Sequence, residues 1–263
     1  MTLPSLFIPH GAGPCFFMEW SRGPADTWDR TADFLRGLVS TLPERPKAIL
    51  VVSGHWEEPA FTVGSSAAPP LIFDYYGFPE STYRLRFDAP GDPALATRVH
   101  DLLAEAGLPA AEDPQRGYDH GVFIPLLLAT PQADIPVVQL SLQAGLDPVA
   151  HLAAGRALAP LRDEGVLIVG SGMSWHNMRG FSPAFTAASD AFDAWLGAAV
   201  ADPSTRDQAL AQWDQAPYAR QAHPREEHLA PLFVAAGAAP GAPGRTMFQD
   251  HAMDVALSAF AFG

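Results

Sequence analysis

Four histidines stand where a buried strand is expected to end or a helix to begin, namely His10, His55, His176 and His228. His10 and His55 follow short apolar runs closely, and His176 comes shortly after the apolar run that ends at Val169. Histidine binds divalent metals through a neutral ring nitrogen and exchanges protons near neutral pH. Imidazoles gathered at strand ends therefore indicate a metal centre with acid–base groups beside it.

Acidic residues flank two of these histidines and leave the ligand set open. They are Glu57, Glu58, Glu226 and Glu227. One of them, joined to two histidines, would form the two-His-one-carboxylate set that favours Fe(II). The simpler alternative is that all four are solvated surface charges. The histidine spacing matches neither a zinc finger nor the His-Glu-x-x-His helix motif, and we expect the single Cys15 to be a small buried apolar residue.

A fifth histidine, His120, lies in the sequence Tyr-Asp-His-Gly at 118–121. Asp and Gly are common in turns, so Asp119 capping the apolar segment 122–128 is one interpretation. The other is a histidine that contacts substrate beside the metal. His100 is expected on a helix surface, and no pattern supports a role for the remaining three, which are His151, His223 and His251.

The elements that position these residues are short apolar strands that alternate with amphipathic helices. Strands are expected at 5–8, 48–52, 137–142 and 166–169, and less clearly at 61–64 and 246–248. Helices are expected at 28–42, from Asp92-Pro93 to 106, from Asp147-Pro148 to 162, and after Ser189. This alternation predicts one α/β domain with a mostly parallel or mixed central sheet and helices on both faces. Ligands of such sheets bind beyond the carboxyl ends of the strands, where His10, His55 and His176 are expected.

His228 has a different predicted setting. Pro224 suits the first turn of a helix, and the acidic residues before His228 suit its positive end. The expected helix runs through Phe233, with His228 in its early part and a bend at Pro231.

The composition limits the class of protein. The chain has 263 residues, 48% of them hydrophobic and 17% charged, which is typical of a globular protein with a large core. A net charge of -13 argues against nucleic acid or an anionic membrane as a partner. One cysteine, no long apolar run and no signal-like N-terminus lead us to expect a cytoplasmic protein.

Several short motifs, in this order and at this spacing, resemble the class III extradiol ring-cleavage dioxygenases. The resemblance runs nearly end to end and is strongest to the 4,5-DOPA dioxygenase branch of the protocatechuate 4,5-dioxygenase beta-subunit superfamily. The matching segments are 6–11 (LFIPHG), 49–56 (ILVVSGHW), 76–79 (YGFP), 89–96 (APGDPALA), 117–121 (GYDHG), 133–141 (ADIPVVQLS), 161–172 (LRDEGVLIVGSG), 176–177 (HN) and 227–228 (EH).

The resemblance implies a role for each of five histidines. His10, His55 and His228 would bind a divalent metal. His176 would act as acid or base beside the substrate, or as a fourth ligand when zinc is bound. His120 would line the substrate pocket and is the second choice for the proton carrier. Flanking aromatic residues either wall the pocket or belong to the core: Trp56, Phe78, Tyr118 and Trp175.

The expected activity is extradiol cleavage of a catechol, DOPA-like or otherwise substituted, by O2 at non-heme Fe(II) in a catalytic domain over residues 1–263. Zn(II) has no accessible redox change, so zinc in the same site suggests the alternatives, a zinc-dependent hydrolase or a non-catalytic metal-binding protein. The chain departs from the branch after the first strand. The usual His-Gly-Ser-Pro is replaced by HGAGPC at 10–15, which bears on the choice of substrate more than on metal binding.

Overall fold

The computed structural model describes residues 1–263 and contains one mixed eight-stranded sheet with helices on both faces. The strands are β1 (Ser5–Pro9), β2 (Ala48–Glu58), β3 (Phe61–Gly64), β4 (Ala110–Asp113), β5 (Val137–Gln143), β6 (Val166–Gly172), β7 (Gly244–Ala252) and β8 (Val255–Phe262). The helices are α1 (Asp29–Gly37), α2 (Pro93–Glu105), α3 (His120–Ala129), α4 (Pro148–Leu158), α5 (Thr186–Ala201), α6 (Arg206–Ala211), α7 (Ala219–Ala222) and α8 (Ala230–Gly237). The α/β fold expected from the alternation of patterns is confirmed.

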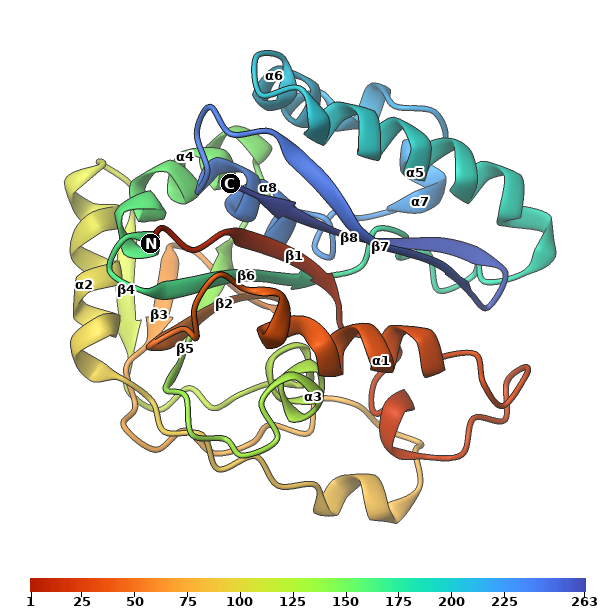
Figure 1. The fold of residues 1–263 in the computed structure, drawn as a ribbon, viewed down its shortest axis with the longest axis horizontal. Coiled ribbons are helices and arrows are strands. Elements are labelled where there is room, and N and C mark those ends of the chain that lie inside the picture. The colour runs from red at the N-terminus through yellow and green to blue at the C-terminus, as the bar shows by residue number, and fades with distance from the viewer.

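The strand order is β4-β3-β5-β2-β6-β1-β8-β7. The four central strands, β5, β2, β6 and β1, are mutually parallel, so their carboxyl ends share one edge. The β7–β8 hairpin pairs antiparallel with β1, which brings the two chain termini side by side (Figure 1). β8 and β4 were not anticipated from the sequence. β8 is buried along its whole length, and periodicity alone does not distinguish its Ala-rich apolar run from a buried helix segment.

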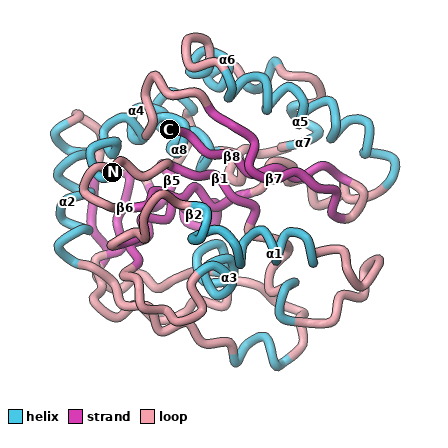
Figure 2. The backbone as a smooth tube through the Cα atoms, in the orientation of Figure 1, coloured by secondary structure: helices cyan, strands magenta, loops and turns pink.

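Each face of the sheet carries its own apolar core. Alternate residues of β2 point to opposite faces: Leu50 and Val52 pack with α4 and α8, whereas Ile49 and Val51 pack with α1 and α3. Figure 2 shows the strands running through the centre with helices above and below them. No helix combines the length and the apolar character needed to cross a membrane.

Three local expectations need correction. β2 extends to Glu58, so His55 lies within the strand, at a point where the pairing with β5 shifts register. The start of the helix expected from Pro224 is wrong. His228 lies in a turn, and the helix that contains Phe233, α8, begins at Ala230. Pro231 therefore occupies the first turn of α8, where no backbone donor is needed, and does not bend the helix.

Candidate metal centre

Three histidines predicted as metal ligands converge at the carboxyl edge of the central strands. The Nε2 atom of His55 lies 3.3 Å from Nε2 of His10 and 3.1 Å from Nε2 of His228. His10 follows β1, and its backbone N–H donates to the Gly172 carbonyl at the end of β6. The turn that carries His228 is fixed to the same strand end, because the Met173 N–H donates to the His228 carbonyl at 3.0 Å.

The Nδ1 contacts of His10 and His228 determine which of their ring nitrogens faces the centre. His10 Nδ1 lies 3.0 Å from the Gly11 carbonyl oxygen, and His228 Nδ1 lies 3.0 Å from Glu227 Oε1. Both partners only accept hydrogen bonds, so Nδ1 carries the proton and Nε2 carries a lone pair. Lone pairs that face one another are satisfied by a cation. Two nitrogens bound to one tetrahedral ion at about 2.0–2.1 Å lie about 3.3 Å apart, and the observed separations fit that value.

The charge state of the three rings also suits a metal. Burial is the main cause that lowers the pKa of all three, and repulsion by neighbouring imidazoles adds to it. The pKa of His55 falls to about 3, and those of His10 and His228 fall well below the ordinary value of 6.5. The rings are therefore neutral at pH 7, which is the form that binds a metal.

His120 lies beside the first two of these rings, at the start of α3. Its ring centroid is 3.9 Å from that of His55 and 5.3 Å from that of His10. Asp74 fixes His120 through two hydrogen bonds. Its Oδ1 atom accepts from His120 Nδ1 at 2.7 Å and from the His120 backbone N–H at 3.0 Å. The other oxygen, Oδ2, lies 3.7 Å from His55 Nδ1. Burial works to raise the pKa of Asp74, but the hydrogen bonds to His120 and the nearby charges of His120 and His55 together outweigh it, and the pKa lies below its ordinary value.

His176 lies against His228 on the other side of the cluster. The two rings are stacked, with centroids 3.3 Å apart and planes 17° apart. Glu227 Oε1 accepts from His176 Nδ1 at 3.1 Å as well as from His228 Nδ1. The atoms that could bind a metal form two groups, and within each group they lie within 4.8 Å of one another. One group is His10, His55 and His120, and the other is His176, Glu227 and His228. The contact between His55 Nε2 and His228 Nε2, 3.1 Å apart, joins the two groups.

The acidic residues flanking His55 and His228 are sorted by their contacts. Glu57 pairs with Arg225, Glu226 pairs with Arg220, and Glu58 accepts from the Trp56 indole at 2.9 Å. Only Glu227 contacts histidines, and it does so at their Nδ1 atoms, on the side away from the Nε2 cluster.

Asp119 does not cap α3 with its side chain, contrary to one sequence interpretation. Its carboxylate is fully buried and accepts from Ser53 Oγ at 2.7 Å, from Arg116 Nη2 at 2.8 Å and from Gln139. Ser53 in turn accepts from the backbone N–H of His55 at 3.2 Å. The network therefore ties the start of α3, with His120, to the part of β2 that carries His55.

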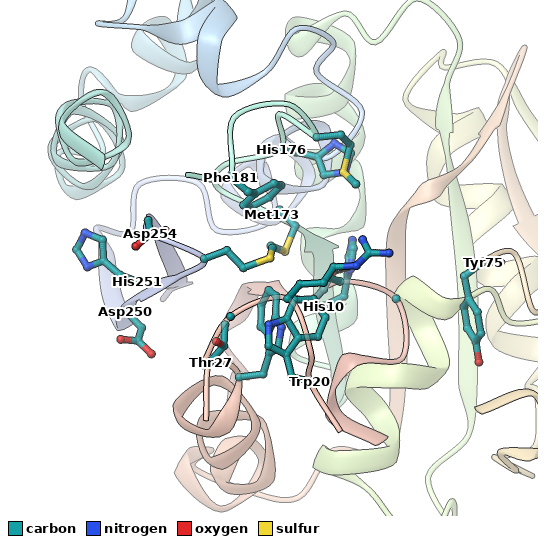
Figure 3. A pocket seen from close by; sticks show the side chains of 18 of the residues that line it. His10, Trp20, Thr27, Tyr75, Met173, His176, Phe181, Asp250, His251 and Asp254 are labelled. Atoms are coloured by element: carbon teal, nitrogen blue, oxygen red, sulfur yellow. Dashed lines mark hydrogen bonds between the residues drawn. The ribbon is translucent and has the colours of Figure 1, made fainter. Parts of the chain in front are cut away.

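A cavity of about 750 Å³ opens from the histidine cluster toward the surface. Figure 3 shows His10 near the middle and His176 above it, with Asp250, His251 and Asp254 of the β7–β8 hairpin on one side and Trp20 and Thr27 below. All five histidines discussed above line it. Its volume lies within the range of about 300–1,000 Å³ that is typical of small-molecule sites.

The aromatic residues that flank the motifs divide between the two alternatives, cavity wall and core. Of the aromatic residues that flank the motifs, only Phe78 lines the cavity, whereas Trp56, Tyr118 and Trp175 are buried in the core. The aromatic residues not anticipated from the sequence are Trp20, Trp28, Tyr75 and Phe181. They lie outside every motif, in or beside loops, so no local pattern marked them. Asp74 was missed for the same reason.

The loop that departs from the usual pattern runs from Gly11 to Cys15. Gly11 has a φ of +85°, and an added Cβ would lie 2.6 Å from Cys15 Sγ. Cys15 is buried, as expected, and belongs to neither group of possible ligands. Gly11, Ala12 and Gly13 line the cavity, so this loop borders the space available to a ligand.

Comparison with known families gives one match over most of the chain. A family described as the catalytic LigB subunit of aromatic ring-opening dioxygenase matches residues 4–258.

Individual relatives agree with this match. The 4,5-DOPA dioxygenase extradiol of Beta vulgaris is 45% identical over 200 residues, which cover 74% of this chain and 74% of the relative. The protein of the same name from Portulaca grandiflora is 39% identical over 239 residues, covering 89% and 85% of the two chains. The crystal structure of an uncharacterized protein from Escherichia coli K12 superposes with a TM-score of 0.74 at 30% identity, covering 99% of this chain and 100% of the other.

Proposed function

The chain belongs to the family of the catalytic LigB subunit of aromatic ring-opening dioxygenases and is thus a ring-cleaving oxidoreductase; from this premise we propose an extradiol dioxygenase that opens a substituted catechol with O2 at non-heme Fe(II). We propose His10, His55 and His228 as the ligands, in a single catalytic domain over residues 1–263. The observation that carries this proposal is the convergence of three Nε2 atoms, 3.1 and 3.3 Å apart, at the floor of an aromatic-lined cavity.

Bound Fe(II) would supply the redox step between catechol and O2 that Zn(II) lacks. The protein residues bind and orient the aromatic ring and move its protons. His176 Nδ1 is held by Glu227, so its Nε2 is free to accept the proton of a catechol hydroxyl. His120, held in the same way by Asp74, is the second candidate for this proton.

In the cavity wall Tyr75 lies beside His120 and Phe78 lies beside Tyr75, and the two give a planar ring an apolar surface. The relatives named above point to a DOPA-like catechol as the first substrate to test. The altered Gly11–Cys15 loop is the part of the wall expected to change that preference.

The test is anaerobic reconstitution with Fe(II), followed by addition of catechols that include DOPA and then of 18O2. We expect oxygen uptake, a yellow ring-opened product and incorporation of both oxygen atoms, detected by mass spectrometry. Iron-loaded protein that takes up no oxygen with any catechol of the panel contradicts the proposal. Turnover with zinc and no oxygen uptake would instead identify a hydrolase.

A further inference from the structure

One carboxylate oxygen is shared by two histidines with different proposed roles. Glu227 Oε1 lies 3.0 Å from Nδ1 of His228 and 3.1 Å from Nδ1 of His176. His228 is a proposed metal ligand and His176 the proposed proton carrier. Because the two rings are stacked almost parallel, both present their Nε2 edges in similar directions, and His228 Nε2 points to His55.

We propose that Glu227 is a positioning residue that fixes His176 and His228 together as Nδ1–H tautomers, so that both Nε2 lone pairs face the centre. The inference rests on the proposed function only in that His228 is taken as a ligand. An imidazole whose Nδ1 proton is held by a carboxylate is also a more basic ligand through Nε2, as in the carboxylate–histidine pairs of other metal sites.

Apart from the two histidines, the Glu227 carboxylate lies near one charged side chain, that of Arg225. Its second oxygen, Oε2, is buried, has no hydrogen bond and lies 3.7 Å from Arg225 Nη1. Arg225 is itself held by Glu57 of β2. A Cβ on Gly172 would overlap the His228 carbonyl oxygen, so the turn packs directly against β6. The carboxylate is thus fixed against the Nδ1 atoms of both rings, on the side away from the Nε2 cluster, and would act on a metal through His228.

The direct test needs no metal. Long-range ¹H–¹⁵N correlation NMR of metal-free protein, labelled at histidine, distinguishes the two imidazole tautomers. Assignment uses the spectra of His176→Gln and His228→Gln. We expect both residues as Nδ1–H tautomers in the wild type. Either residue found as the Nε2–H tautomer overturns the inference.

The second test measures metal affinity with Co(II), whose visible absorption also reports the coordination geometry. Removal of an outer carboxylate partner weakens a metal site by about 10–100-fold, so we expect a loss of that size in Glu227→Ala. Glu227→Gln keeps one acceptor oxygen without the charge, and we expect a smaller loss. Glu226→Ala is the matched control, since this neighbouring carboxylate pairs with Arg220 and contacts no histidine.

A Glu227→Ala protein with the Co(II) affinity and spectrum of Glu226→Ala overturns the inference. Circular dichroism and thermal unfolding of each variant separate a loss of folding from a loss of positioning, and Glu227→Gln serves if the alanine variant does not fold. Failure of the proposed function has a different signature. Iron-loaded wild type that opens no catechol, yet shows the expected tautomers and Co(II) affinities, leaves this inference intact.

Discussion

At the scale of single residues, four of the five histidines with proposed roles have their Nδ1 atoms held by a hydrogen-bond acceptor. A backbone carbonyl holds His10, Asp74 holds His120, and Glu227 holds both His176 and His228. Each of these three partners accepts a hydrogen bond, so each of the four histidines keeps its Nε2 available. The proposed ligands and proton carriers are therefore separated by where the Nε2 atoms lie and not by ring chemistry.

The ligand assignment predicts a difference between histidine variants. His10→Ala and His228→Ala should each lose bound Fe(II), because each removes one of three converging nitrogens. His176→Ala should keep the iron and lose turnover by about 10²–10⁴-fold, the usual contribution of a proton-transfer group. Iron content and oxygen uptake measure the two effects. Loss of iron from His176→Ala would show that His176 is a ligand.

Asp74 supports a separate prediction. Asp74→Asn removes the charge that orients His120 and lies near His55, so we expect kcat to fall about 10–100-fold. Asp88→Asn, in the same connecting segment but exposed, is the control. Equal kcat values for the two variants would show that the Asp74 charge does not contribute to turnover.

At the scale of elements, the site depends on glycines that let a turn and a helix approach β6 closely. A Cβ on Gly170 would overlap the Pro231 carbonyl oxygen in the first turn of α8, and one on Gly172 would overlap the His228 carbonyl oxygen. Larger residues at these positions would push the turn that carries His228 away from β1 and β2. Close packing of α8 and the preceding turn on β6 therefore places His228, the third proposed metal ligand, at the site.

Gly170→Ala should lower the free energy of unfolding by about 1–3 kcal/mol, the usual cost of inserting a methyl group into a packed interface. Gly37→Ala is the matched control, because it lies at the end of α1 and an added Cβ meets nothing within 4 Å. The control should be neutral or slightly stabilising. Denaturant unfolding measures both, and equal stabilities would show that α8 can shift without cost.

At the scale of the whole molecule, parallel strands gather the histidines from distant parts of the chain, and burial keeps them neutral. Burial is the first cause that lowers the pKa of His223, as of the three proposed ligands, and it brings this pKa to about 3. His223 lies behind the site, where its Nε2 contacts the Ser174 carbonyl. The folded protein therefore holds at least four histidines that resist protonation.

Acid should destabilise the metal-free protein. These histidines have pKa values near 6.5 when unfolded. In the folded protein the pKa values of His55 and His223 are about 3 and those of His10 and His228 lie well below 6.5, so below pH 6.5 the unfolded chain binds more protons. Each such histidine then lowers the free energy of unfolding by up to about 1.4 kcal/mol for each pH unit of acidification, until the pH reaches the pKa that the histidine has in the folded protein. Burial raises the pKa of Asp119 and Asp193, which opposes this loss with fewer groups.

Denaturant unfolding in EDTA at pH 7, 6 and 5 measures the slope. A free energy of unfolding that stays constant over this range would contradict the neutral, buried state of the histidine cluster.

The sequence by itself predicted the α/β class, most of the strands, the helices α1, α2, α4 and α5, and five histidines that the structure brings to one cavity. These features are local, because each depends on a pattern that is complete within a few residues. The patterns are apolar runs bounded by Gly and Pro, Asp-Pro helix starts and short motifs. The cap is one example, since Asp92 Oδ1 accepts from the Leu95 N–H at the start of α2 as its position predicts. The turn at His228 was misjudged because Pro224 and Pro231 are each compatible with a first helical turn, and the sequence does not distinguish them.

Only the tertiary structure decided how the histidines are held and what surrounds them. Asp74 is 46 residues from His120, and Glu227 is adjacent to His228 but 51 residues from His176. Contacts across such distances leave no periodic or motif signal, because they form only when separate strands and turns meet at one edge of the sheet. The same holds for Trp20, Tyr75 and Phe181, which the fold brings from separate segments to the wall of one cavity.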